Sequence, residues 1–281
     1  MKLAFSTLGC PNFDLEDVAR AAREYGYAAV ELRALGRSLD LLSRAEFHPS
    51  EIARTRDWLI EQGVAVCCVD TSCSFDSVDD DERLRQVELA VSHCELAAAL
   101  GSRLIRVFPD KVPQGSSYEE TRDRIAESLR SVALRAPEGV RVGLETHGDF
   151  ASGRASADII RSADHPNLYI IWDAANSFAA GEPIEDSAAA VAPYLAHVHL
   201  RDARPEGGEH WTPVLAGRGL VPFAEVVAAL QGLRYDGFVS FEWEKYWHPE
   251  IEDPEVSLPD FAGAMRKILG EAFVPQFWKV I

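Results

Sequence analysis

The chain has 281 residues, of which 47% are hydrophobic and 26% are charged. This composition is typical of a globular protein and argues against the disordered, fibrous and membrane-spanning classes. The formal net charge of −17 disfavours binding to nucleic acid or to anionic membranes, because both depend on Lys and Arg side chains. We therefore expect a small molecule or a metal cation as the partner.

The N-terminal stretch MKLAFSTLGC does not resemble a secretion signal, because its apolar run is short and no small-residue cleavage site follows it. We interpret it as a first strand and expect a cytoplasmic protein. The five cysteines contain no Cys-x-x-Cys pair, so neither a disulfide framework nor a zinc ribbon is predicted.

Eight strand-like runs alternate with helix-like segments along the chain. In order, the strand-like runs are residues 3–8, 28–34, 64–70, 103–109, 140–146, 168–174, 196–202 and 238–244. The segments between them carry apolar residues at helical spacing, and residues 260–269 supply a last helix. Asp14 can cap the first helix, Pro183 and Pro222 suit the first turns of later helices, and Gly26 suits a helix end.

Eight βα units in a chain of this length predict an α/β fold, a single (β/α)8 TIM barrel formed as one domain by residues 1–281. A doubly wound open sheet is the alternative. In a barrel, alternate side chains of each strand face the interior and the helix layer. The polar residues near the strand ends can therefore be assigned a direction.

Polar side chains lie near the C-terminal ends of four successive strands, and the alternation directs three of them inward. In the fifth strand Leu144 suits the helix layer and Glu145 the interior, and the same pattern directs His199 and Glu242 inward from the seventh and eighth strands. In the sixth strand both faces are apolar, so the alternation decides little about Asp173. Barrel enzymes place their active sites at these C-terminal strand ends.

Each of these residues, taken alone, has a structural explanation. An inward carboxylate can pair with an arginine such as Arg106 or Arg33, and a barrel histidine can be a satisfied core residue. Together, however, three carboxylates would repel one another unless a cation lies among them. A divalent ion with one imidazole ligand meets that need, and Mn²⁺, Mg²⁺, Co²⁺ and Zn²⁺ all suit such ligands.

The motifs VGLETH, IIWDAAN, VHLRD and FEWEK, in this order, resemble the xylose isomerase-like TIM-barrel superfamily of sugar isomerases and epimerases, which also includes inosose dehydratase and endonuclease IV. The resemblance covers essentially the whole chain. It implies one metal ion, with Mn²⁺ favoured, held by Glu145, Asp173, His199 and Glu242. It also implies that Glu145 and Glu242 act as acid and base.

The activity that the resemblance implies is a metal-dependent isomerase or epimerase, which moves a proton at the carbon beside a carbonyl of a sugar or keto-sugar through an enediolate. A dehydratase (lyase) of the inosose dehydratase type is the alternative, and a noncatalytic sugar-binding barrel is a third hypothesis. The sequence does not identify the sugar, the native metal or the oligomeric state, although relatives are often homo-oligomers.

Further side chains are predicted to contact the substrate. They are His147, Asn176, Arg201, His210 and Lys245. The alternatives are an exposed loop position for His147, an internal salt bridge for Arg201 and a solvated surface charge for Lys245. Glu31 and Arg33 also point inward, from the second strand, and could form a structural pair or touch the substrate.

Two further motifs bear on whether the chain is a nuclease and whether it binds phosphate. Asp173-Ala-Ala-Asn176 has an amide where many relatives have a histidine, and an amide is a poor ligand for a second metal. Together with the acidic net charge, this argues against a nuclease. The segment AGRGL, residues 216–220, precedes a helix where barrels often bind phosphate, but a tight loop into the helix is the preferred interpretation.

Overall fold

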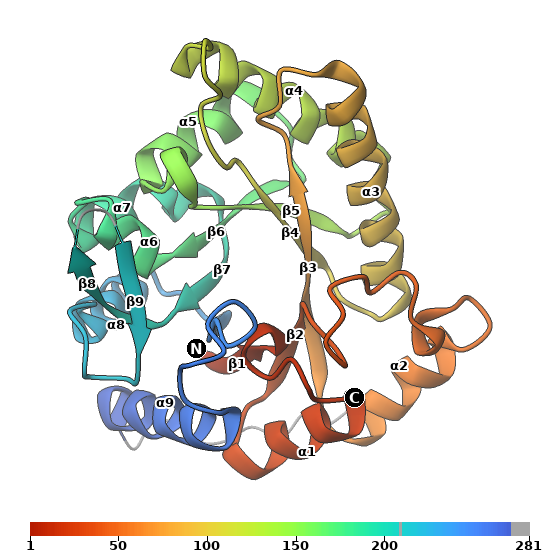
Figure 1. Ribbon diagram of the computed structural model, residues 1–281, viewed down its shortest axis with the longest axis vertical. Coiled ribbons are helices and arrows are strands. Elements are labelled where there is room, and N and C mark those ends of the chain that lie inside the picture. The colour runs from red at the N-terminus through yellow and green to blue at the C-terminus, as the bar shows by residue number, and fades with distance from the viewer. Residues whose placement is uncertain (208–209, 271–281) are drawn as a thin grey trace. The chain divides into compact units, whose positions relative to one another are not determined.

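A computed structural model describes residues 1–207 and 210–270 of the chain (Figure 1). Parallel strands form a closed barrel in the order β1-β10-β7-β6-β5-β4-β3-β2, which confirms the predicted (β/α)8 fold. The barrel strands are β1 (Lys2–Ser6), β2 (Ala29–Leu32), β3 (Ala65–Ser74), β4 (Leu104–Phe108), β5 (Arg141–Glu145), β6 (Leu168–Asp173), β7 (Leu195–Leu200) and β10 (Phe238–Phe241).

Helices follow the strands along the chain. They are α1 (Leu15–Tyr25), α2 (Ile52–Glu61), α3 (Asp80–Ala99), α4 (Tyr118–Arg135), α5 (Gly153–Ala163), α6 (Ala174–Ala179), α7 (Ile184–Val191), α8 (Phe223–Gly232) and α9 (Pro254–Leu269). None of the helices in the described ranges has the length and apolarity needed to cross a membrane.

The predicted helix boundaries are confirmed at α1 and shifted elsewhere. The Asp14 carboxylate accepts a hydrogen bond from the backbone N–H of Asp17 at 2.9 Å, and Gly26 ends the helix with a left-handed φ of 79°. Pro183 and Pro222 each precede the first helical residue instead of lying inside the first turn. Both rings still fix the backbone immediately before a helix starts.

By its internal contacts the chain divides into two compact units, Met1–Cys67 with His199–Ile281 and Cys68–Val198. In the first unit, β1 pairs in parallel with β2 and β10. The ring of Phe241 on β10 stacks on Phe261 of α9, with centroids 4.3 Å apart. Phe241 therefore faces the helix layer, and α1 and α9 lie side by side there (Figure 1).

In the second unit, β3, β4, β5 and β6 pair in parallel. Cys68, Leu104 and Ile171 form a buried cluster. A Cβ atom on Gly143 would lie only 2.7 Å from Cγ1 of Ile171, so this position of β5 needs glycine.

A two-stranded antiparallel sheet follows β7, and the strand-like runs of the sequence do not include it. Its strands are β8 (Asp202–Gly207) and β9 (His210–Val214). Residues 204–207 of β8 are exposed and show no apolar alternation, which explains why the hydrophobic pattern did not predict this strand.

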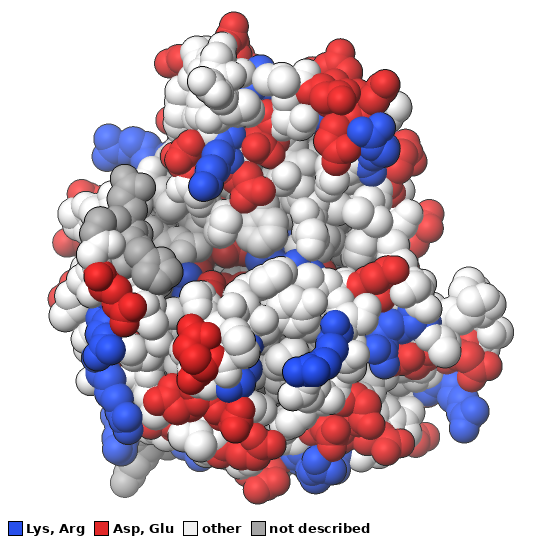
Figure 2. Space-filling view, viewed as in Figure 1, with Lys and Arg blue, Asp and Glu red and all other residues white. Residues whose placement is uncertain are grey.

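Acidic side chains gather on the surface at the start of α3, where Asp80, Asp81 and Glu82 occupy the first helical turn (Figure 2). Carboxylates at this position are stabilised by the partial positive charge of a helix N-terminus. Part of the large negative charge thus serves helix stability, away from the barrel interior.

Candidate metal and catalytic site

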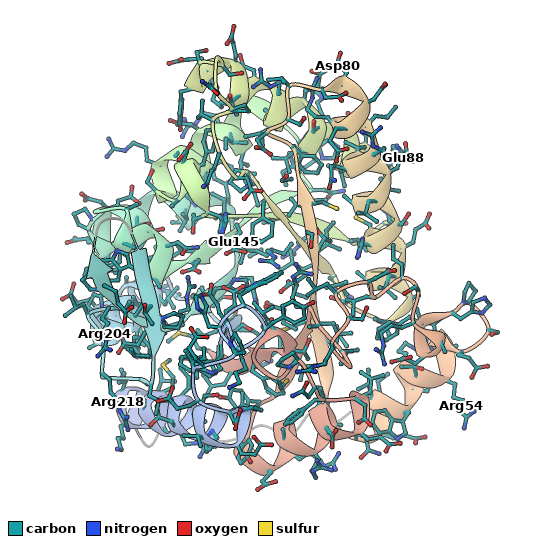
Figure 3. The ribbon with its side chains drawn as sticks, in the orientation of Figure 1. Arg54, Asp80, Glu88, Glu145, Arg204 and Arg218 are labelled. Carbon is teal, nitrogen blue, oxygen red and sulfur yellow. The ribbon has the colours of Figure 1, made fainter. Side chains whose placement is uncertain are left out.

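The strand β5 ends on Glu145, whose side chain is buried. Its Oε2 accepts a hydrogen bond from Nη1 of Arg106 at 2.6 Å, and Nη2 of Arg106 lies 3.7 Å from Asp70 Oδ2. Figure 3 labels Glu145 at the end of β5, and Asp80 and Glu88 on α3. The predicted pairing with Arg106 is confirmed. It does not exclude metal binding, because a carboxylate offers about four lone-pair sites.

The strand β6 ends on Asp173, which is fully buried. The preceding Trp172 donates its indole N–H to Ser187 Oγ on α7 at 3.0 Å, so alternation turns Asp173 to the opposite face of the strand. Its Oδ1 accepts from the backbone N–H of Asn176 at 2.8 Å and caps α6. The start of α6 therefore fixes the position of the Asp173 carboxylate, whose direction the sequence pattern did not predict.

The predicted substrate contact Asn176 lies beside this cap. Its Nδ2 donates to the backbone carbonyl of Thr146 at 3.1 Å, and the Thr146 hydroxyl accepts from the backbone N–H of Asp173 at 2.9 Å. These bonds tie the end of β5 to the start of α6. The side chain of Asn176 thus has a structural role, and a substrate contact stays a prediction.

His147 follows Glu145 by two residues and is partly exposed. Its Nδ1 lies 3.1 Å from Asp110 Oδ1, and its ring packs on Phe108 with centroids 4.6 Å apart. Burial lowers the pKa of His147, but the contact with Asp110 and the charge of Glu145 outweigh that effect, so the pKa is raised. An oriented imidazole that solvent can reach is compatible with the predicted substrate contact.

His199 is fully buried on β7 and lies between two carboxylates. Its Nε2 is 3.0 Å from Oε2 of Glu31 on β2, and its Nδ1 is 3.3 Å from Oε2 of Glu242, just beyond β10. Glu31 and Glu242 are 0% and 3% exposed. From the sequence, Glu31 could form a structural pair with Arg33 or touch the substrate. Its contact with His199 was not predicted.

Arg201 also lies against Glu242. Its Nη1 is 3.4 Å from Glu242 Oε2, and its Nη2 is 3.3 Å from Glu244 Oε1. The side chain is largely buried, which strengthens such ion pairs relative to surface ones. The internal salt bridge considered for Arg201 is confirmed, and a substrate contact stays a prediction.

The last two residues predicted to contact the substrate are Lys245 and His210. The ammonium of Lys245 donates to the carbonyls of Pro249 and Ile251 and lies 2.9 Å from Asp253 Oδ1. Lys245 therefore holds together the loop between β10 and α9, which does not favour the predicted substrate contact. The backbone of His210 begins β9, but its side chain lies outside the described part of the structure.

The glycine-rich loop before α8 is held by a buried carboxylate. Asp202 accepts hydrogen bonds from the backbone N–H groups of Gly217, Gly219 and Val221 at 2.8, 2.9 and 3.1 Å. A phosphate group would need such N–H donors, and here an acidic side chain uses them. The tight-loop interpretation is confirmed.

Acidic and histidine side chains cluster as a candidate divalent metal site. Among the described residues this group comprises Glu145, Asp173, His199 and Glu242. All four side chains are buried, and buried charges require a partner or a metal ion. Three carboxylates and one imidazole fit Mn²⁺, Mg²⁺, Co²⁺ or Zn²⁺, and these donor types alone do not select one of them.

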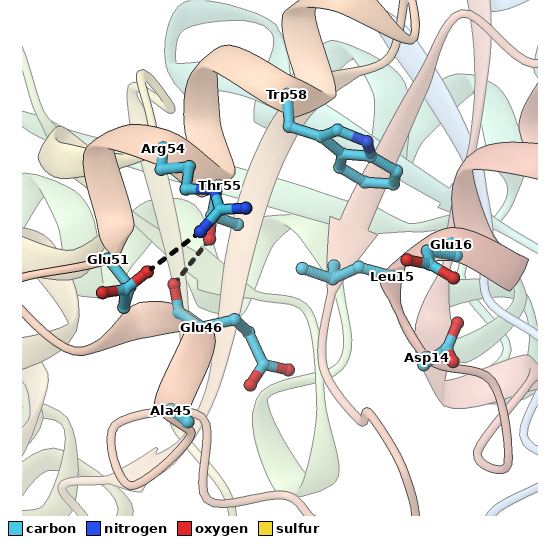
Figure 4. Close-up of a pocket in the computed structure, with 9 residues that line it drawn as sticks. All are labelled: Asp14, Leu15, Glu16, Ala45, Glu46, Glu51, Arg54, Thr55 and Trp58. Carbon is cyan, nitrogen blue, oxygen red and sulfur yellow. Dashed lines mark hydrogen bonds and ion pairs between the residues drawn. The ribbon is translucent and has the colours of Figure 1, made fainter.

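A separate surface groove of about 710 Å³ lies beside α1 and α2 (Figure 4). Its charged side chains have local structural roles: Asp14 caps α1, and Glu51 lies 3.9 Å from Arg54 of α2. Trp58 adds an apolar wall. None of the residues predicted for the site lines this groove.

Comparison with known proteins gives an uncharacterized protein and two dehydratases as relatives. The chain is 29% identical over 174 residues to an uncharacterized protein of Methanocaldococcus jannaschii, and that match spans 58% of each chain. It is 24% identical to a 3-dehydroshikimate dehydratase of Bacillus anthracis, over 81% of this chain and 84% of that protein. It is 23% identical to an inosose dehydratase of Klebsiella pneumoniae, over 96% and 97% of the two chains.

Solved structures share the fold. The IOLI protein with a bound zinc atom superposes with a TM-score of 0.82 at 18% identity, covering 97% of this chain and 99% of that one. A D-tagatose 3-epimerase-like protein gives a TM-score of 0.76 at 20% identity, covering 96% and 97%. A profile of the xylose isomerase-like TIM barrel family matches residues 19–266. The chain therefore belongs to the xylose isomerase-like TIM barrel family.

Proposed function

We propose that this chain is a divalent-metal-dependent isomerase or epimerase that transfers a proton at the carbon next to a carbonyl of a sugar or keto-sugar. The observation that carries the proposal is the buried group Glu145, Asp173, His199 and Glu242. We assign these four residues as ligands of one divalent ion, with Mn²⁺ as the native metal. The structure of the IOLI protein, which holds zinc, supports a metal in this fold.

Proton removal from such a carbon is difficult, because the C–H bond is weakly acidic and the product enediolate is an anion. A bound divalent ion would supply Lewis-acid stabilisation of the negative charge that develops on the carbonyl oxygen. Glu145 and Glu242 are the proposed proton acceptor and donor. The Arg106 guanidinium beside Glu145 and the Arg201 guanidinium beside Glu242 hold the two side chains in place.

Two side chains are the better proposals for substrate binding. His147 is oriented by Asp110 and is partly exposed, so it can bind a hydroxyl group. Arg201 is within reach of the proposed acid/base residue Glu242. Because Asp202 already occupies the loop N–H groups before α8, we propose a substrate that does not place a phosphate group there.

Dehydration is the second candidate, since two relatives that span most of the chain are named dehydratases. Both reactions begin with the same proton abstraction. In an epimerase the opposite glutamate, in its carboxylic acid form, returns a proton to the other face of the carbon. In a dehydratase the carboxylic acid form of the second glutamate instead protonates the departing β-hydroxyl, which leaves as water.

The test is to incubate the chain with Mn²⁺ and a panel of keto-sugars and inososes in D₂O and to follow the substrate by NMR. Exchange of a carbon-bound proton that chelation abolishes is the expected result. A change of configuration would identify an epimerase, and loss of water with a new enone absorbance would identify a dehydratase.

The double variant Glu145→Gln, Glu242→Gln is the matched control, because it keeps side-chain size and removes both carboxylates. If native protein and double variant give the same exchange rate, the chain is not an enzyme of this class. Retained sugar binding without exchange would instead identify a noncatalytic sugar-binding barrel.

A further inference from the structure

The contact between Glu31 and His199 connects a proposed metal ligand to a residue outside the proposed ligand set. Glu31 comes from β2, where it pairs in register with Ser6 of β1. His199 comes from β7, and both side chains are 0% exposed. The Nε2 atom of His199 lies 3.0 Å from Oε2 of Glu31. Because both side chains are buried, this contact leaves the imidazole ring little freedom to rotate.

The chemistry of the two groups assigns the protons. An ionised carboxylate only accepts hydrogen bonds, whereas a neutral imidazole has one N–H donor and one nitrogen with a lone pair. The contact with Glu31 therefore requires the proton on Nε2. Metal binding requires the other nitrogen, Nδ1, to carry the lone pair, and this atom faces Oε2 of Glu242.

The opposite assignment, with the proton on Nδ1 and directed to Glu242, is less favourable for two reasons. The distance to Glu242 is 3.3 Å, longer than the 3.0 Å to Glu31. The same oxygen of Glu242 also lies 3.4 Å from the guanidinium of Arg201. Glu242 thus divides its accepting capacity between His199 and Arg201.

We propose that Glu31 is a positioning residue that holds His199 in its Nε2–H tautomer and thereby presents Nδ1 as the metal-binding atom. The metal part of this inference rests on the proposed function. A carboxylate that accepts the second N–H of a ligating histidine fixes its ring and makes it a better ligand, and its loss typically weakens metal binding about 10- to 100-fold.

The direct test is NMR of the full chain with ¹⁵N-labelled histidine, prepared free of metal. Long-range proton–nitrogen correlations distinguish the two tautomers, and the variant His199→Gln assigns the His199 signals among the eight histidines. In the native chain we expect the Nε2–H form. In Glu31→Gln we expect a mixture, because an amide can both donate and accept and so no longer selects one tautomer.

The second readout is affinity for Zn²⁺ and for Mn²⁺, measured by competition with a chelator. Glu31→Gln should bind each ion about 10- to 100-fold more weakly than the native chain. Ser240→Ala is the control, because Ser240 is a buried polar residue of β10 outside the proposed site, and it should bind like the native chain.

The outcomes separate this inference from the proposed function. A native chain with the Nδ1–H tautomer, or a folded Glu31→Gln variant with native tautomer and affinity, would overturn the role of Glu31. If the native chain binds no ion, the proposed metal function fails, while the tautomer spectrum still decides whether Glu31 orients His199. Should Glu31→Gln not fold, the native spectrum alone gives this decision.

Discussion

The two compact units hold their proposed ligands by opposite electrostatic means. In Cys68–Val198, the carboxylate of Glu145 is paired with the cation Arg106. In the unit that contains His199, the imidazole lies between the carboxylates Glu31 and Glu242. Each proposed ligand is therefore positioned by a group of complementary charge or hydrogen-bonding type. Loss of the partner should leave a buried negative charge in Cys68–Val198 and a misoriented imidazole in the unit that contains His199.

The largest effect is expected when the two proposed acid/base residues are changed one at a time. Glu145→Gln and Glu242→Gln should each slow proton exchange by about 10²- to 10⁴-fold, the usual contribution of a positioned general acid or base. NMR of the substrate in D₂O measures the rate. If only one substitution has an effect, a single residue transfers the proton, and the assignment of both glutamates as acid and base is wrong.

Removing the Arg106 cation from the unit Cys68–Val198 should lower the stability of the chain. Arg106→Met leaves Glu145 and Asp70 buried without their guanidinium partner, and breaking such a pair lowers the free energy of unfolding by about 3–5 kcal/mol. Urea unfolding followed by circular dichroism measures the change. The matched control is Arg135→Met, which breaks the exposed pair with Glu88 and should have little effect. Equal effects of the two variants would contradict the structural importance of the Arg106 pair.

A smaller effect is expected at Asp202, a buried acid that belongs to the same unit as His199 and accepts hydrogen bonds from the loop before α8. Asp202→Asn replaces one accepting oxygen by an NH₂ group that faces backbone N–H donors. Loss of such a bond should lower the free energy of unfolding by about 1–3 kcal/mol and speed amide exchange at Gly217 and Gly219. Metal affinity should stay unchanged; a large loss would mean that Asp202 also supports the metal site.

The fold and much of the proposed site were predictable because barrel strands alternate side chains between two environments. This periodicity is sufficient to predict the inward direction of Glu145 and Glu242. It failed at Asp173, because β6 is apolar on both faces. The structure resolves that case through Trp172, which bonds to α7, and through Asn176, whose N–H binds the Asp173 carboxylate.

Pairings between distant strands could not be predicted. Glu31 and His199 are 168 positions apart, and the sequence contains no local sign that these side chains meet. The alternation made Glu31 an inward residue but could not choose between Arg33, the substrate and His199 as its partner. Likewise, no short motif indicated that Asp202 would bind the loop N–H groups, a contact that decides against phosphate in that loop.

The central claim is that Glu145, Asp173, His199 and Glu242 hold one divalent ion. The most direct measurement is the metal content per chain after loading with Mn²⁺ and dialysis, for the native protein, Asp173→Asn and Asp202→Asn. Asparagine can still cap α6 through its side-chain oxygen, so Asp173→Asn should remain folded. We expect one ion per chain in the native protein and in Asp202→Asn, and none in Asp173→Asn. A native chain without metal, or an Asp173→Asn variant that keeps its ion, would contradict the account.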